Sequence, residues 1–237
     1  MSTWAAKRFW KDATVEESSG KYIILLDGRL VKTPAKATLK VPNAAMAQAI
    51  AEEWQAQEEK INPEIMPNTR SANAAIDKVA HQKAEVVAMI AAYGEDDFLC
   101  YRAPGPEELI ARQSDAWDPI LAWAAKELDA PLITVEGVIH KNQPPDSITN
   151  LTAQVSGQTE FQLTALHDLV SMSGSLVIGL AAQAGAYPVK DLWDWSRLDE
   201  LWQIEKWGGD EDAEATAELK QASFFHANRF YKLACEK

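Results

Sequence analysis

The sequence predicts an α+β protein, with a small β-rich module at residues 1–67 followed by a mainly helical domain at residues 68–237. Three observations carry this prediction. A tight-turn signal, Asp27-Gly28, separates two apolar, β-rich runs near the N-terminus. Two X-Pro pairs between residues 62 and 67 then interrupt the chain, and helical periodicity dominates from Ser71 onward.

The strands come first. Residues 22–26 and 29–32 flank Asp27-Gly28, and both turn positions of such a hairpin need positive φ, which Asp and Gly tolerate. A further strand is expected at residues 38–41, after the break at Pro34. The turn residues 18–20 suggest that residues 8–15 pair with residues 21–26.

The helices follow in order. Asn43 is expected to cap a helix that runs to about residue 58, because Met46, Ile50 and Trp54 recur every four residues on its buried side. A helical stripe ends at Tyr93-Gly94, and a second helical run starts near Pro106, with Pro119 interrupting or restarting it. A short β-branched stretch at 131–138 precedes the remaining expected helices, at residues 160–172, 174–184, 193–208 and 212–233.

Composition narrows the function classes. The chain has 35 acidic and 23 basic side chains, a net charge of −12, which repels nucleic-acid backbones and favours a basic or amphipathic protein partner. Cys100 and Cys235 stand far apart and are expected to be reduced thiols. No segment has the length and apolarity of a membrane span, and the N-terminus shows no leader pattern, so a cytosolic protein is expected.

Residues 193–208 form the most distinctive stretch, with four of the nine tryptophans between Pro188 and Gly208-Gly209. On one continuous helix, Trp195, Leu198, Leu201 and Trp202 would share a face, opposite Ser196, Asp199, Glu200 and Gln203. Glu205 falls inside the apolar stripe. Burying a carboxylate is costly without a partner, so Glu205 is either paired inside the fold or held at a surface meant for another molecule.

Catalytic and metal-binding motifs are missing from the sequence. It has no phosphate-binding loop, no dinucleotide fingerprint and no histidine pair at metal-ligand spacing, so we expect neither cofactor nor metal. His167-Asp168 could be half of an acid–base pair, but a capped helical histidine explains it more simply. Trp207, beside the terminal glycines, is expected to be partly exposed, and aromatic residues near charges are typical of interfaces.

Six short strings, taken together, resemble a known family. They are R-F-W-K at 8–11, L-D-G-R-L-V-K-T-P at 26–34, E-W-Q-A-Q at 53–57, L-C-Y-R at 99–102, Q-S-D-A-W-D-P at 113–119 and Q-I-E-K-W-G at 203–208. In this order, over nearly the whole chain, they resemble the assembly chaperones for the catalytic sector of the F-type ATP synthase, in the branch that acts on the α subunit.

The resemblance implies a non-enzymatic holding chaperone with a small N-terminal α+β domain and a helical C-terminal domain. Such a protein would bind the unassembled α subunit and shield the surface that β subunits later cover. The family's important acidic position would fall on Glu205, with Glu200 as the alternative, and we expect Asp199, Trp202 and Trp207 beside it in the partner-binding surface. The location would be the bacterial cytoplasm, or the mitochondrial matrix for a mature eukaryotic form.

Two other readings stay open at this stage. The first is a hydrolase or transferase with an acidic site between the two domains that uses Asp96, Asp97, His167 or Glu205; it predicts a deep pocket with convergent polar groups. The second is a structural subunit of a stable complex. The chaperone reading predicts a broad, shallow, partly apolar surface instead.

Overall fold

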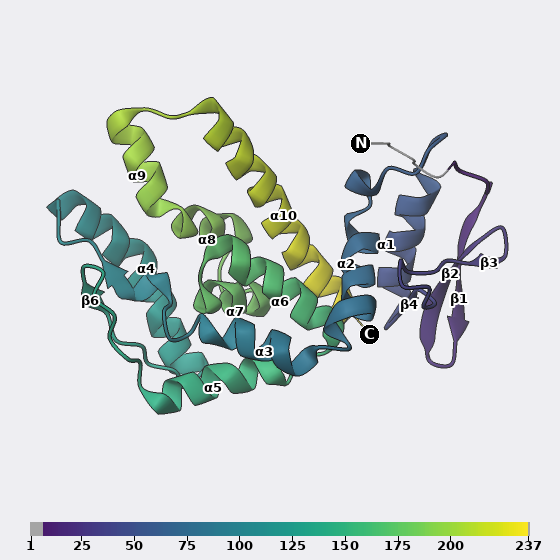
Figure 1. Cartoon of the computed structure of the whole chain (residues 1–237). Coiled ribbons are helices and arrows are strands. Elements are labelled where there is room, and N and C mark those ends of the chain that lie inside the picture. The colour runs from purple at the N-terminus through teal and green to yellow at the C-terminus, as the bar shows by residue number, and fades with distance from the viewer. Residues whose placement is uncertain (1–6, 237) are drawn as a thin grey trace. The chain divides into compact units, whose positions relative to one another are not determined.

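The computed structural model describes residues 7–236, and its elements are shown in Figure 1. Residues 1–6 and Lys237 lie outside the described residues. The prediction that the N-terminus lacks a leader pattern falls largely on residues 1–6. By internal contact the chain forms two units. The first takes the chain up to Lys83 together with Thr159–Ala165 and Arg229–Lys237, and the second takes Ala84–Gln158 and Leu166–Asn228.

The first unit contains an antiparallel sheet. Strand β1 (Ala13–Ser18) pairs with β2 (Lys21–Leu26) in the register Ala13↔Leu26, so the expected pairing of residues 8–15 begins five residues later than predicted. The Asp27-Gly28 hairpin is confirmed, with φ values of 47° and 78°, and it joins β2 to β3 (Arg29–Leu30). Strand β4 (Lys40–Val41) pairs with the other end of β2.

Helix α1 (Ala44–Gln55) packs on this sheet and begins where the sequence predicts. The Asn43 side chain accepts a hydrogen bond from the backbone N–H of Met46 at 2.9 Å, which satisfies one of the free donors of the first turn. Met46 and Ile50 are fully buried, as expected. The core of the unit also receives Phe161 and Phe230, whose rings lie 6.5 Å apart, from segments distant in the sequence.

The helical part continues from there. Its elements are α2 (Pro67–Ala74), a π-helical turn (Ala75–Val79), α3 (Lys83–Ala92), α4 (Glu107–Glu127), α5 (Pro145–Ser156), α6 (Glu160–Ser173), α7 (Leu176–Ala184), α8 (Val189–Ser196), α9 (Leu198–Trp207) and α10 (Glu211–Cys235). Two short parallel strands, β5 (Tyr101–Arg102) and β6 (Val135–Glu136), lie among them. The expected α+β class is confirmed: a small strand module precedes a mainly helical region.

Helix α7 is the centre of the second unit. Every residue from Leu176 to Ala182 is buried, which explains why this stretch is the most apolar of the chain although it is far too short to cross a bilayer. Within residues 7–236 no helix is both long and apolar enough to span a membrane. Helix α4 packs against α7 and α9, and α7 against α8, so α7 supports the elements that carry the candidate site.

Pro119 does not interrupt its helix, contrary to the prediction. Helix α4 runs through it as a single 21-residue element. A proline removes one backbone donor and normally bends or ends a helix. Here Trp117 and Ile120, on either side of it, are both buried in the core of the second unit, so tertiary packing holds the helix together across the missing bond.

Candidate client-binding surface

The tryptophan-rich segment forms two helices rather than the single helix predicted. Helix α8 ends at Ser196 and α9 begins at Leu198, because Arg197, at φ −114° and ψ 13°, leaves the helical conformation. The Arg197 guanidinium forms an ion pair with Glu200 and lies 5.6 Å from the Trp193 ring centroid. No proline or glycine marks this break, so periodicity alone could not reveal it.

The break changes which side chains share a face. Leu201, expected on the buried stripe, is 41% exposed, whereas Trp202 is buried at 5%. Trp193 is also buried and packs on Phe224, with ring centroids 5.5 Å apart. Trp207 is 77% exposed, which confirms the expectation that it is open to solvent. The tryptophans therefore divide between core and surface.

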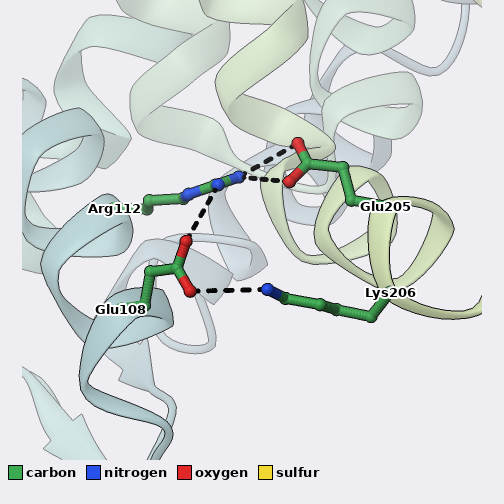
Figure 2. A network of polar contacts seen from close by, with 4 residues as sticks. All are labelled: Glu108, Arg112, Glu205 and Lys206. Atoms are coloured by element: carbon green, nitrogen blue, oxygen red, sulfur yellow. Dashed lines mark hydrogen bonds and ion pairs between the residues drawn. The ribbon is translucent and has the colours of Figure 1, made fainter.

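Glu205 lies at the surface and, as Figure 2 shows, is paired with Arg112. Nη1 of Arg112 donates to both carboxylate oxygens of Glu205, at 3.0 and 2.8 Å. Glu108 pairs with Arg112 on its own helix α4 at 3.3 Å, and its contact with Lys206 at 3.4 Å connects α4 to α9 a second time. The side chains of Glu205 and Arg112 are 51% and 41% exposed. The sequence left open whether Glu205 is paired inside the fold or held at a surface. The structure places it at the surface, and its partner Arg112 is also accessible to solvent.

Trp202 forms the floor of this network. The Arg112 guanidinium carbon lies 4.7 Å from the Trp202 ring centroid, and Nζ of Lys206 lies 4.3 Å from it. Cations at such distances are attracted by the negative face of the indole. The buried ring thus lies against both cations, whose side chains are 41% (Arg112) and 43% (Lys206) exposed.

The other predicted site residues occupy different positions. Oδ1 of Asp199 accepts a hydrogen bond from Nε2 of Gln113 at 2.7 Å, which ties the start of α9 to α4. Glu200 and Trp207 lie on the side of α9 that faces α10, where they line a groove. The structure therefore gathers Glu205 and Trp202 on the α4 side of α9. Sequence reasoning missed Arg112 and Glu108; their i, i+4 spacing indicates only a pair on one helix.

The residues of the rival catalytic reading serve other roles. Asp97 is fully buried and accepts hydrogen bonds from the hydroxyl of Ser175 at 2.8 Å and the N–H of Val177 at 3.0 Å, so it holds the first turn of α7. Burial raises the pKa of its carboxyl to about 6, although those bonds oppose the shift. Asp96 contacts His140 at 2.7 Å, and the His167 ring is hydrogen-bonded to its neighbour Asp168 at 3.0 Å.

Metal and disulfide sites can be assessed for the described part of the chain. In residues 7–236, no three His, Cys, Asp or Glu side chains are grouped so as to hold a metal ion. Cys100 is buried and Cys235 exposed, and both are free. Cavities beside α9 are open to solvent and lined by a mixture of carboxylates and apolar side chains. Such surfaces resemble protein-binding faces more than enclosed small-molecule sites.

Comparison with known proteins identifies the family of the chain. The model of a family described as ATP12 chaperone protein matches residues 7–125. The mitochondrial protein atp12 of Schizosaccharomyces pombe is 25% identical over 219 residues, covering 87% of this chain and 75% of that protein.

Solved structures are similar over almost the full length. Atp12 from Paracoccus denitrificans is 47% identical, with a TM-score of 0.95, and the match covers 97% of this chain and 98% of that one. The Atu1473 protein from Agrobacterium tumefaciens is 40% identical, with a TM-score of 0.91, covering 95% and 85% of the two chains. With a family model that matches half of the sequence and a structural relative of this identity, the chain belongs to the ATP12 chaperone family.

Proposed function

We propose that this protein is a holding chaperone for the α subunit of the F-type ATP synthase catalytic sector, acting without catalysis. Membership in the ATP12 chaperone family supports the chaperone role. The resemblance of its motifs to the α-subunit branch supports the choice of client. In a bacterium the protein would work in the cytoplasm, and in a eukaryote in the mitochondrial matrix, as the name of the fission-yeast relative suggests.

The contact surface we propose covers two sides of α9, with Glu205 on the α4 side and Glu200 and Trp207 on the α10 side. Asp199 and the buried Trp202 support it from within. The half-exposed carboxylate of Glu205, which accepts two hydrogen bonds from Nη1 of the Arg112 guanidinium that lies over Trp202, is the observation that supports this choice most directly. An unassembled subunit exposes apolar surface that would otherwise aggregate. Exposed Trp207 and Leu201 supply apolar contact area, and Glu205 supplies an acceptor for a client arginine.

Binding at Glu205 would proceed by exchange. In the free protein Nη1 of Arg112 bonds to both carboxylate oxygens, and an incoming client guanidinium replaces this single-nitrogen contact with a bidentate pair of its own. Because both members of the resident pair are about half exposed, losing it costs the fold little. Release then follows when β subunits compete for the same face of the client, and no nucleotide is required.

The test is co-expression of the α subunit with the wild-type protein, a Glu205→Gln variant and a matched control. Glu127→Gln is a suitable control, because Glu127 is also half exposed and paired with a cation, Lys126, at 2.7 Å. We expect the soluble fraction of α to fall with Glu205→Gln and to stay at the wild-type level with Glu127→Gln. Soluble α in the absence of the chaperone, or equal protection by both variants, would contradict the proposal.

A further inference from the structure

Helix α9 and the first turns of α10 form a hairpin that reverses at Gly208-Gly209 (Figure 1). Gly208 has a φ of 89°, a conformation that favours glycine, and it ends α9. In α10, all residues from Glu211 to Lys220 are exposed except Ala217, which is half-buried. The packed core of the second unit is reached only further along the helix, at Phe224. Three turns of α10 therefore lack the neighbours that normally cover one face of a helix.

The two helices of the hairpin enclose a groove that is open on both sides. The larger side has a volume of 580 Å³ and the smaller side 260 Å³. Four residues line both sides: Arg197, Ile204, Ala213 and Ala217. The floor of the groove is thus formed largely by one isoleucine and two alanines at i, i+4 spacing on α10. Small side chains at this spacing leave room for another helix to approach closely.

The rim of the groove combines apolar and acidic side chains. Trp207, 77% exposed, stands on the larger side, and Leu201, 41% exposed, on the smaller. Residues 197–221 carry eight carboxylates and three cations, a net charge of −5, whereas the whole chain of 237 residues carries −12. Part of this charge also stabilises the first turns of α9 and α10. Any approaching partner nevertheless meets a strongly negative field around an apolar floor.

We infer that the larger side of this groove, which is distinct from the Glu205 face of α9, seats a basic amphipathic helix of the client. The apolar edge of such a helix, with anchors at i, i+3 and i+4, fits over Ile204 and Ala217 beside Trp207. Its lysines and arginines face Asp210 and Asp212 on the rim, and Glu200, which is paired with Arg197 in the free protein. Lys220, the other cation of this lining, lies further along α10. An acidic helix with the same apolar edge would be repelled. The inference rests on the proposed function only in taking the client to be a protein.

The chain offers matched variants for a test. Ala217→Trp fills the floor, and Thr216→Lys adds a cation to the lining of the larger side. Ala215→Trp and Ala215→Lys are the controls, because Ala215 is exposed on the same turn of α10 and lines neither side of the groove. Circular dichroism and thermal melting test whether each of the four variants folds like the wild type. The lysine pair keeps the test informative if the bulky Ala217→Trp variant fails to fold.

The probes are fluorescently labelled helical peptides of about 18 residues, enough for five turns. One carries leucine on one face and lysine elsewhere, and the other has glutamate in place of lysine. In anisotropy titrations against the full-length protein we expect only the leucine–lysine peptide to bind. Ala217→Trp and Thr216→Lys should each weaken its binding about tenfold, the loss typical of blocking one central contact. The Ala215 variants should match the wild type.

Three results would overturn the inference. Equal peptide affinity in the groove variants and their controls would show that the helix binds elsewhere. Equal affinity for the leucine–glutamate peptide would remove the role of charge. Concentration-dependent dimerisation in light scattering, lost in Ala217→Trp, would show that a second copy of the chain fills the groove.

Failure of this inference can be told apart from failure of the proposed function. If Glu205→Gln loses α-subunit protection while Ala217→Trp retains both protection and peptide affinity, the groove is not a docking site but the chaperone function stands. If the peptide depends on the groove while wild-type protein gives the α subunit no protection, the groove stands and the client is a different protein.

Discussion

The stability of this protein should depend on pH through one buried acid, Asp97. Its carboxylate caps the 3-10 turn Phe98–Cys100 through the N–H of Leu99 at 3.2 Å and holds the first turn of α7 through Ser175 and Val177. Complete burial raises its pKa from 3.8 to about 6, which means that the folded protein binds this proton more tightly than the unfolded chain does.

The sign and size of the effect follow from that difference. Below pH 3.8 the group is protonated in both states, and above pH 6 it is ionised in both, so its influence changes between these values. Between these pH values the folded protein holds the proton of Asp97 while the unfolded chain has already lost it. The free energy of unfolding therefore falls as the pH rises through this window. At about 1.4 kcal/mol per pKa unit, the fall from this group alone is about 3 kcal/mol.

Urea unfolding at half-unit steps from pH 4 to pH 7.5 measures this contribution, when wild type is compared with Asp97→Asn. His140 and His167, whose pKa values are raised because their rings donate hydrogen bonds to Asn142 and Asp168, are present in both proteins, so their effects cancel in the difference. The variant should be less stable throughout, since an amide cannot accept all of the carboxylate's bonds, but its deficit should shrink as pH rises.

An exposed acid provides the control. Asp146→Asn, in the first turn of α5, should give a curve parallel to that of the wild type. If the Asp97→Asn and wild-type curves are also parallel, or if the deficit grows with pH, the assignment of Asp97 as a buried, charge-penalised structural acid is wrong.

Three further predictions concern single side chains. Trp207→Ala should change the free energy of unfolding by less than about 0.5 kcal/mol, because the ring is 77% exposed, yet lower α-subunit protection in the co-expression assay; a large stability loss would show that the ring is structural. Gly179→Ala should lower the free energy of unfolding by about 1–3 kcal/mol, since an added Cβ would lie 2.6 Å from Cγ2 of Val170. An unchanged urea midpoint would mean that α6 and α7 can move apart enough to accept the methyl group without loss of stability. Asn43→Ala should cost about 2 kcal/mol, because the side chain caps α1 and also donates to the carbonyl of Leu233 at 2.7 Å; Asn43→Asp should restore the cap but not the second bond.

Local signals predicted the local structure well. The Asp27-Gly28 turn and the Asn43 cap each depend on the conformation or hydrogen bonds of a few adjacent residues, and the structure confirms both. Two predictions were wrong where tertiary packing determines the helix bounds. Helix α4 passes through Pro119 because the residues on either side are buried, and α8 ends at Ser196 without any helix-breaking residue. The expected domain boundary after residue 67 stays a prediction, although the first contact unit runs to Lys83.

The candidate site could be predicted only in part. The helical wheel singled out Glu205 as an acid next to apolar residues, and it is indeed at the surface beside Trp202. Its partner Arg112 is 93 positions away in the sequence, and a single sequence holds no record of which distant residues meet. Because Arg112 occupies Glu205 in the free protein, we propose that a client binds by replacing Arg112. The sequence alone suggested only that Glu205 is the binding position.

The core of the first unit has a consequence for biosynthesis. Phe161, Ala165 and Phe230 complete a hydrophobic cluster whose other buried residues all precede position 76, and Asn43 donates to the carbonyls of Leu233 and Glu236. Helix α1 can cover the sheet early in synthesis, but the core of this unit is complete only after nearly the entire polypeptide has left the ribosome. The N-terminal strands and the C-terminal end of α10 therefore have to meet late in folding, as a contact between the two ends of the chain.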